Sequence, residues 1–423
     1  DVLSLFSWRE NFPQIFERGG FDLIVGNPPY GLSRDEQIST AENELLKQIY
    51  SSIRSGKVNK YMVFMARGLE LLNSRGALCF VVPNSWLGIR SAAALRRKII
   101  GMRALESISV CLFKAFEDPS VEAVVVKLDK SRRHERIRIE HLYEPHMQQA
   151  AKFFELPAAE CSGDPECKIA LTWSPEVLEV LRAIASSSQK LSERIELFEP
   201  LIALQAYAAG KGTPPQSAED VKRHIFDRNT KESALDIPYL EGSDIERFQV
   251  NWSGGYLHYG PWLAEPQNLD RFTGPRVVIR EILASPPYLL RAAVVEDQFL
   301  YNKSVLHIVA DRRGKTGLQE MQALCAILNS KLASFVILHK GRKSQRSLFP
   351  KIVNDDLLDL PLPSNFDRHA GQLAKLLARP GQIPDDELNT LVYECYRLKN
   401  SHVSTIEQSL ASKKWHAAIA QNN

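Results

Sequence analysis

The sequence has no apolar run long enough to cross a membrane, which needs about 18 consecutive apolar residues. The most apolar stretch, CAILNSKLASFVIL at 325–338, is interrupted by Asn329, Ser330 and Lys331. The first residues also lack the basic, apolar and small-residue order of a secretory signal. We therefore expect a cytoplasmic protein without a membrane partner.

Cysteine is scarce and scattered: the six residues occupy positions 79, 111, 161, 167, 325 and 395, and no C-x-x-C occurs. Structural zinc needs closely spaced cysteine and histidine ligands, so we expect no metal centre and reduced thiols. Net charge is also low, because 53 basic residues nearly balance 50 acidic ones and leave +3. A nucleic-acid partner must therefore be inferred from local basic clusters and not from overall charge.

The first 150 residues alternate between strand-like and helix-like segments. FDLIVG at 21–26 and ALCFVV at 77–82 are short apolar runs that end at a turn or a proline, which predicts buried strands. Between them, apolar residues at helical spacing predict a helix over 59–73, with Asn59 as its N-cap. Further elements are expected at 92–101 (a helix capped by Ser91) and near 104–110, 122–128 and 136–142 (strands). The alternation indicates an α/β fold with a parallel sheet covered by helices.

The character of the sequence changes along the chain and predicts four segments. Residues 1–150 form the first α/β domain, and residues 151–190 form a helical connector in which LTWSPEVLEVLRAIA has one apolar face. Residues 191–365 are richer in glycine, proline and aromatic residues, which indicates an irregular α/β domain with long loops. Residues 366–423 form a C-terminal helical segment.

The stretch FDLIVGNPPYG at 21–31 carries the clearest chemical signal. In an open parallel α/β sheet, ligands bind beyond the carboxyl ends of the strands, where Asn27 is expected. Pro28 and Pro29 have fixed φ angles and no N–H, so they hold their carbonyls rigidly without a competing donor. The Asn27 side-chain oxygen and one such carbonyl form a pair of acceptors for a planar –NH2 group. Accepting both hydrogens raises the electron density on that nitrogen, and Tyr30 offers a flat ring on which a base can stack.

A strand-ending turn would also explain Asn-Pro-Pro, but three segments taken in order resemble a known enzyme family. NPPY after an apolar strand resembles motif IV of S-adenosylmethionine-dependent amino-methyltransferases. NKYMVFMARGLELLNSRGALCFVVPNSWL at 59–87 is similar to the helix and strand that follow in the gamma class of N6-adenine DNA methyltransferases, and AFEDPSVEAVVVKL at 115–128 resembles their motif VIII. The resemblance implies that residues 1–150 are a catalytic domain with a partial Rossmann-like methyltransferase sheet.

The resemblance also implies a role for each motif residue. Asn27 and the Pro28 carbonyl would hold N6 of the target adenine, and Pro29 would stiffen this pair. Tyr30 would stack on one face of the flipped base, while Phe116, which in isolation would be assigned to the core, would pack against the other. Flipping is required because N6 lies inside the duplex stack. No general base is demanded, since the sulfonium is a strong electrophile and positioning and desolvation can carry much of the barrier.

The cofactor pocket is expected to be incomplete in this chain. Members of the family bind S-adenosylmethionine with a strand, a glycine-containing loop and an acidic residue, all before motif IV. Only 20 residues precede Phe21, and ERGG at 17–20 is better explained as a loop into the strand. Asp1 matches the acidic residue, and Asn27 borders the same pocket. We expect the 423-residue chain to bind the cofactor weakly or not at all.

The second half resembles the TaqI-like target-recognition domain, which follows the catalytic domain in type IIG restriction–modification enzymes. The resemblance rests on IPYLEGSDIERFQVNWSGGYLHYG (237–260), PRVVIREIL (275–283), NKSVLHIV (302–309) and FPKIVNDDLLDLPLP (349–363). It implies that residues 191–365 bind double-stranded DNA.

One segment within this half, HKGRKSQRSLFP at 339–350, is basic and contains no acid. A solvated loop would explain its charge, but its place in a recognition domain favours contact with DNA phosphates or guanine edges. The candidates are Lys340, Arg342, Lys343 and Arg346, with Lys303, Arg276 and Arg280 as weaker ones that could equally be structural.

The leading hypothesis is methylation of adenine N6 in double-stranded DNA within a restriction–modification system. No nuclease motif stands out, since IPDDELNTLVYE at 383–394 lacks the required lysine, so an associated restriction endonuclease domain or subunit would lie upstream of Asp1. Protein N5-glutamine methyltransferases share Asn-Pro-Pro-Tyr but lack a long domain after the catalytic fold. A DNA-binding specificity module without activity of its own is the third alternative.

Overall fold

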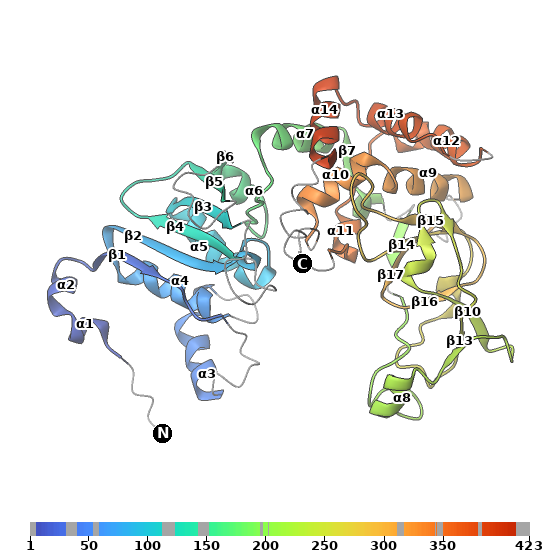
Figure 1. The fold of residues 1–423 in the computed structure, drawn as a ribbon, viewed down its shortest axis with the longest axis horizontal. Helices are drawn as coiled ribbons and strands as arrows, with labels where there is room; N and C mark the ends of the chain where they lie inside the picture. The colour runs from blue at the N-terminus through green and yellow to red at the C-terminus, as the bar shows by residue number, and fades with distance from the viewer. Residues whose placement is uncertain are drawn as a thin grey trace. The chain divides into compact units, whose positions relative to one another are not determined.

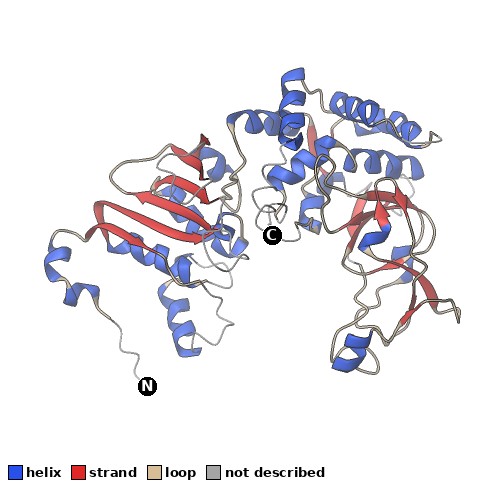
Figure 2. Cartoon of the chain, viewed as in Figure 1, coloured by secondary structure: helices blue, strands red, loops and turns tan. Residues whose placement is uncertain are grey.

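The computed structural model describes residues 6–30, 40–53, 59–111, 123–142, 152–194, 198–201, 203–310, 317–342, 344, 350–379 and 383–411. The chain divides into two compact units, with the boundary between Pro175 and Glu176. Both units combine helices and strands, as Figures 1 and 2 show. The α/β fold class expected from the sequence is therefore confirmed.

Among the described residues, the first unit contains a six-stranded sheet and six α-helices. The strands are β1 (Phe21–Gly26), β2 (Leu72–Pro83), β3 (Leu105–Cys111), β4 (Ala123–Asp129), β5 (Arg136–Leu142) and β6 (Lys152–Pro157). The helices are α1 (Trp8–Asn11), α2 (Pro13–Glu17), α3 (Thr40–Ile49), α4 (Lys60–Leu71), α5 (Ala93–Gly101) and α6 (Ala158–Gly163), with 3₁₀ turns at Ser51–Ile53, Asn84–Leu87 and Arg90–Ala92. The predicted elements are present, but Ser91 lies inside a 3₁₀ turn and Ala92 is the N-cap of α5.

The six strands lie in the order β1-β2-β4-β3-β5-β6, and their directions are mixed. β1 is parallel to β2 and β3 is parallel to β5, whereas β4 is antiparallel to both its neighbours and β6 is antiparallel to β5. The sheet is therefore mixed, and the parallel pairing expected from the alternation is found between β1 and β2 and between β3 and β5. Residues 112–122 alone connect β3 to β4, which is shorter than the crossover of a dozen or more residues that parallel neighbours need.

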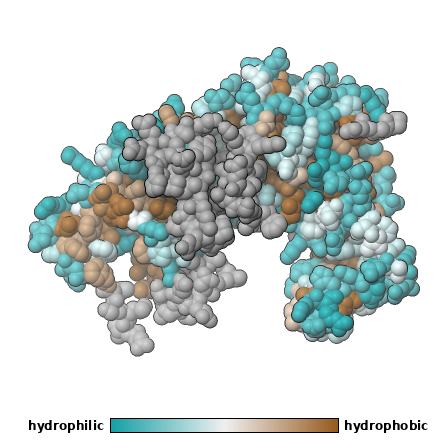
Figure 3. Space-filling model, viewed as in Figure 1, coloured by the Kyte–Doolittle hydropathy of each residue, from teal (hydrophilic) through white to brown (hydrophobic). Residues whose placement is uncertain are grey.

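β1 forms one edge of this sheet and is more exposed than a buried strand would be. Leu23 and Val25 are 60% and 69% exposed, and Figure 3 shows hydrophobic residues gathered on the visible face of the first unit. The other side of the sheet packs closely on α4, because a Cβ added at Gly68 would lie 2.3 Å from Leu78. An apolar run predicts the strand but not whether both of its faces are covered.

The second unit contains two four-stranded sheets and several helices among its described residues. One sheet has the order β15-β14-β17-β8 and joins β8 (Phe198–Leu201), β14 (Arg276–Arg280), β15 (Ala292–Val295) and β17 (Val305–Ala310). The other has the order β16-β10-β13-β9 and joins β9 (Asp227–Arg228), β10 (Asp236–Leu240), β13 (Tyr256–His258) and β16 (Leu300–Tyr301). Two small pairs join β11 (Ile245–Glu246) to β12 (Gln249–Val250) and β7 (Ser188–Lys190) to β18 (Pro361–Pro363).

The helices of the second unit are α7 (Pro175–Ser186), α8 (Ala218–Arg223), α9 (Leu318–Leu328), α10 (Lys331–Lys340), α11 (Asn354–Leu358), α12 (Phe366–Leu377), α13 (Asp385–Cys395) and α14 (Asn400–Ala411). α9 packs on β14, β15 and α12, and α10 packs on α13 and α14. The apolar stretch at 325–338 is therefore the helical core of this unit. No single described helix is long and apolar enough to span a membrane; α9 and α10 meet those criteria only as a pair bent by 62°.

The segment expected to be a helical connector is partly a strand. Residues 152–157 form β6, which pairs antiparallel with β5 and completes the first sheet. Helical structure begins at α6 and continues in α7, at the boundary between the units. The residues of β6, KFFELP, do not alternate between apolar and polar, so the helical pattern that follows them dominated the prediction.

Candidate active site at the ends of β1 and β2

The Asn-Pro-Pro-Tyr motif lies at the carboxyl end of β1. Because β1 is parallel to β2, with Gly26 opposite Phe80, both strands end at the same edge of the sheet. Asn27 is exposed, whereas the next residue, Pro28, is buried. Because proline has a fixed φ angle, the backbone that carries the Asn27 side chain is held rigidly. Gly26 allows the end of β1 to lie close to the Phe80 ring, since a Cβ at position 26 would lie 3.3 Å from that ring. The position of Asn27 agrees with the ligand-binding edge expected for this kind of sheet.

Tyr30 is held against β2. Its hydroxyl donates a 3.0 Å hydrogen bond to the carbonyl of Val81. Its ring lies perpendicular to that of Tyr61, with an interplanar angle of 87° and 6.3 Å between centroids. Burial, with a smaller contribution from the Cys111 thiol, raises the pKa of Tyr30 to about 12. The phenol is therefore neutral at pH 7 and remains a hydrogen-bond donor.

Tyr61 is itself fixed in the core. It lies in the first turn of α4 and is 1% exposed. Its hydroxyl accepts a 3.4 Å hydrogen bond from Asn59 Nδ2 and lies 3.5 Å from Ser85 Oγ. Ser85 belongs to the 3₁₀ turn Asn84–Leu87, which follows β2 directly. Tyr61 thus connects the start of α4 and the end of β2 to the motif tyrosine.

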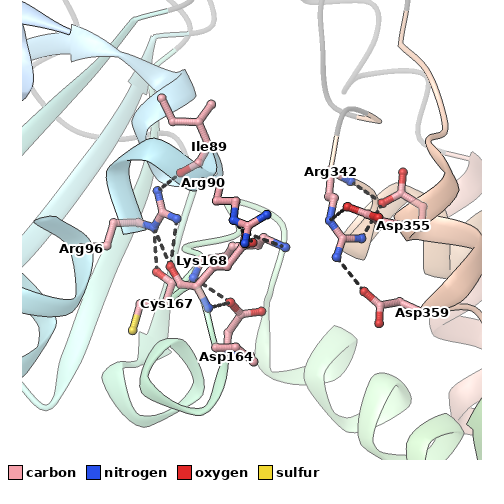
Figure 4. Close-up of polar contacts among 12 residues, drawn as sticks. Ile89, Arg90, Arg96, Asp164, Cys167, Lys168, Arg342, Asp355 and Asp359 are labelled. Atoms are coloured by element: carbon pink, nitrogen blue, oxygen red, sulfur yellow. Dashed lines mark hydrogen bonds and ion pairs between the residues drawn. The ribbon is translucent and has the colours of Figure 1, made fainter. Parts of the chain in front are cut away.

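The turns that follow β2 are held by a buried arginine. Arg96, on α5, donates to the carbonyls of Trp86, Ile89 (2.9 Å), Glu166 (2.9 Å) and Cys167 (3.0 Å), and Figure 4 shows the contacts with Ile89 and Cys167. Burial lowers the pKa of this guanidinium. The backbone beside the candidate site is therefore fixed by charge-assisted hydrogen bonds.

The described residues before β1 do not build the glycine-loop pocket of a nucleotide cofactor. Residues 6–20 form α1 and α2, whose aromatic side chains pack around Phe21. Gly19 and Gly20 have φ of 93° and 126°, and a Cβ on Gly20 would lie 2.4 Å from the Leu71 carbonyl oxygen. These glycines allow the chain to pass close to the end of α4, which agrees with a loop into the strand. The described residues therefore do not fit S-adenosylmethionine, apart from the neighbouring Asn27.

Several predicted site residues lie outside the described part of the chain: Asp1, Phe116, Lys343 and Arg346. Their roles stay predictions. Lys303, in the turn between β16 and β17, is exposed, and so is Lys340, the last residue of α10. Exposure is what a contact with DNA phosphates requires, but it does not by itself establish one.

Arg342 has an intramolecular environment that the sequence did not indicate. Its guanidinium lies 3.7 Å from Asp355, 3.1 Å from Asp356 and 2.8 Å from Asp359, in the region drawn in Figure 4. Asp356 is buried, and Asp359 is also paired with Lys190 at 2.8 Å. The local segment contains no acid, but α11 and the residue after it supply three. The ion pairs of this arginine therefore link the residues after α10 to α11.

Arg276, a weaker DNA candidate, is buried inside the second unit. It donates to the carbonyls of Gly274 (2.9 Å) and Asp297 (2.7 Å) and to the Tyr301 hydroxyl (3.3 Å). Its side chain is fully inaccessible to solvent, which gives it a structural role. Arg280, at the other end of β14, is half-buried.

One group of ligand-type side chains gathers elsewhere in the first unit. Ligand atoms of Glu106, Asp129 and His134 lie within 4.8 Å of one another. Lys127 pairs with Glu106 at 2.9 Å, and His134 pairs with Asp129 at 3.2 Å. The two carboxylates already have partners, so the group carries no assignment as a metal site.

Sequence reasoning missed Tyr61 and Ser85 as neighbours of the motif. Tyr61 lies within 59–73, the segment predicted as a helix from its apolar spacing, and it is buried. The signal that could have identified both is topological. Parallel strands end at the same sheet edge, which brings Ser85, after β2, to the motif, and α4, which connects β1 to β2, begins near that edge with Tyr61 in its first turn.

Two family models match separate parts of the chain. Residues 2–116 match the Eco57I restriction-modification methylase, and residues 237–362 match the TaqI-like C-terminal specificity domain. A putative type II restriction enzyme and methyltransferase from Methanocaldococcus jannaschii is 23% identical over 389 residues, which cover 89% of this chain and 30% of that protein. A type II methyltransferase from Thermus thermophilus is 33% identical over 138 residues, which cover 30% of this chain and 32% of that protein. The chain thus spans about a third of the length of these relatives.

Solved structures of restriction–modification enzymes also align with the chain. The type IIL enzyme MmeI in complex with DNA is 9% identical and aligns over 94% of this chain and 57% of that one, with a TM-score of 0.49. The type IIG restriction endonuclease BpuSI is 12% identical and aligns over 94% of this chain and 54% of that one, with a TM-score of 0.38.

Proposed function

We propose that this chain, in which an Eco57I restriction-modification methylase segment precedes a TaqI-like specificity domain, belongs to a site-specific DNA methyltransferase that acts on N6 of a flipped adenine. The observation that carries the proposal is the position of Asn27 at the end of β1. Its side chain is exposed, the next residue Pro28 is buried, and the hydroxyl of Tyr30 is bonded to the carbonyl of Val81. The matched methylase segment includes all of these residues.

The chemistry assigned to the motif is recognition of an exocyclic amine. The Asn27 side-chain oxygen and the Pro28 carbonyl accept the two N–H groups, which increases the electron density on the nitrogen. Tyr30 stacks on the flipped base, and its neutral hydroxyl keeps the bond to Val81. S-adenosylmethionine is the proposed methyl donor, and no step is assigned to its contacts, because the described residues do not form its pocket.

The second unit is proposed to recognise double-stranded DNA within a restriction–modification system. The match to a specificity domain supports this role, as do the exposed Lys303 and Lys340. Contacts of lysine and arginine with phosphates would supply affinity without regard to sequence, and sequence selection would come from side chains that reach the base edges.

Substitution of Asn27 tests the proposal. We expect Asn27→Ala, in the full-length enzyme, to lose N6-methyladenine formation on unmethylated DNA, as measured by mass spectrometry of the nucleosides. DNA affinity in a gel-shift assay should stay within a few-fold, because phosphate contacts supply most of the affinity. Asn11→Ala, at an exposed asparagine of the first unit outside the candidate site, is the matched control and should keep full activity. Methylation of glutamine in protein instead of DNA, or full turnover by Asn27→Ala, would refute the assignment.

One observation favours a second candidate function, a DNA-binding specificity module without activity of its own. Residues 237–362 match a TaqI-like C-terminal specificity domain, and this match concerns recognition and not methyl transfer. This alternative predicts DNA binding that does not respond to S-adenosylmethionine and no methyl transfer under any condition.

A further inference from the structure

The hydrogen bond between Tyr30 and Val81 leaves one motion of the Tyr30 ring uncontrolled. A tyrosine ring rotates about the axis that runs from Cβ through the ring to the hydroxyl oxygen. Rotation about this axis scarcely moves the oxygen, so the 3.0 Å distance to the Val81 carbonyl oxygen is kept at every ring angle, and the ring plane is restrained only through the preference of the phenolic O–H for that plane. The bond therefore fixes the position of the hydroxyl oxygen but leaves the angle of the ring plane only weakly restrained.

Among the described residues, the ring of Tyr61 is a neighbour that restrains the plane of Tyr30. The two rings are perpendicular, at 87°, with centroids 6.3 Å apart. A neighbour in this geometry opposes rotation about the Cβ–hydroxyl axis, because a turned ring would collide with it or lose the edge-to-face contact. Because the two rings are perpendicular, the Tyr61 ring is not stacked on a face of Tyr30, as a parallel ring would be.

Tyr61 is suited to this task because it cannot easily move. It is 1% exposed, and its hydroxyl lies between Asn59 Nδ2 at 3.4 Å and Ser85 Oγ at 3.5 Å. Asn59 occupies the N-cap position of α4, without a side-chain cap hydrogen bond, and Ser85 follows β2, which is the strand that pairs with β1. The restraint that Tyr61 places on Tyr30 therefore comes from the same sheet that carries Asn27.

We propose that Tyr61, anchored by Asn59 and Ser85, is a positioning residue that holds the Tyr30 ring in the plane on which the flipped base stacks. The inference rests on the proposed function and deepens it. Stacking requires parallel planes, and a ring that is already aligned loses less conformational freedom when the base arrives. Tyr61 acts through Tyr30 and need not touch the substrate.

The experiment is a fluorescence titration of the 423-residue chain with 2-aminopurine deoxyriboside monophosphate. The free nucleotide is bright, and stacking on an aromatic ring quenches it. We expect Tyr61→Leu to weaken the quenching association by about fivefold, the range that one aromatic pair supplies. Tyr61→Phe keeps the ring and should rescue most of the loss. Tyr50→Leu, which removes another buried tyrosine of the first unit, is the matched control and should quench as the wild type does.

The outcomes separate this inference from the proposed function. Quenching by Tyr61→Leu equal to that of the wild type overturns the positioning role. Quenching by Tyr30→Ala equal to that of the wild type shows instead that the base does not stack on Tyr30, so the proposed site itself fails. If Tyr61→Leu does not fold, the Asn59→Ala/Ser85→Ala double variant leaves both rings in place, and NMR of labelled tyrosine should show faster ring flips of Tyr30. An unchanged flip rate in that variant also overturns the positioning role.

Discussion

Single arginines of the second unit differ in what their guanidinium groups contact. Arg276 is bound to two carbonyls and a hydroxyl inside the core, and Arg342 is bound to three aspartates. A charge that is already paired gains little from a phosphate, because the internal partner would have to be released first. Positive residues near a proposed DNA surface must therefore be judged by their existing partners and not by their number.

We expect Arg342→Ala to destabilise the second unit by about 1–3 kcal/mol, because the buried Asp356 loses its charge partner. The salt dependence of DNA binding should not change. Arg346→Ala, by contrast, is predicted to reduce the slope of log K against log[salt] by about one phosphate contact. Urea unfolding and filter binding at several salt concentrations measure the two effects. A flatter slope with unchanged stability for Arg342→Ala would reverse the assignment.

At the scale of elements, β17 brings a histidine into the core of the second unit. His307 is fully buried, and neither ring nitrogen has a hydrogen-bond partner among the described residues. The ring packs against Tyr301 with 5.0 Å between centroids. Burial, reinforced by the charges of Arg276 and Arg271, lowers the pKa of His307 from 6.5 to about 3. The folded chain therefore holds this side chain neutral.

This burial predicts a loss of stability in acid. The pKa of His307 is lower in the folded state, so protonation favours the unfolded state. The resulting loss in the free energy of unfolding is small above pH 6.5 and grows as the pH falls from 6.5 toward 3. At pH 5.5 it should amount to about 1 kcal/mol. Urea unfolding at pH 7.5 and 5.5 should show a smaller decrease for His307→Leu than for the wild type. The exposed His224→Leu is the control, and an equal decrease in all three proteins would contradict the prediction.

The edge strand β1 leads to a second prediction at this scale. Leu23 and Val25 are largely exposed, so Leu23→Lys and Val25→Thr should each change the free energy of unfolding by about 0.5 kcal/mol or less. Leu78, which pairs with Ile24 and is fully buried, is the matched control; Leu78→Ala should cost about 2–5 kcal/mol. The exposed substitutions should also reduce self-association in light scattering, because an apolar sheet edge favours aggregation. A large loss of stability on Leu23→Lys would mean that this face is covered.

At the scale of the whole molecule, the division at residues 175 and 176 is a prediction about folding. Each unit has its own buried core, and the C-terminal helices α12 and α14 pack onto α9 and α10 of the second unit. We expect residues 176–413 to unfold cooperatively by themselves, with a urea midpoint close to that of the same unit in the full chain. Circular dichroism of the separate fragment measures this. A molten or insoluble fragment would show that the second unit depends on the first.

The boundaries predicted from the sequence agree with this division only in outline. The change of composition near residue 190 predicted a second, loop-rich domain after it, whereas the two units divide between residues 175 and 176 and β6 lies in the first unit. The last helices were predicted as a separate segment, and they complete the core of the second unit. Composition varies gradually along a chain, whereas packing decides which segments share a core.

By itself, the sequence determined the chemistry proposed for residues 27–30, the existence of most helices and strands, and the two family resemblances that the matched models confirm. These features are local, because the motif is contiguous and the periods of helices and strands extend over a few residues. Only the tertiary structure decided the strand directions, the exposure of Leu23, the aspartate partners of Arg342 and the place of Tyr61 beside Tyr30. Each of these depends on contacts between residues far apart in the chain, which a local pattern does not encode.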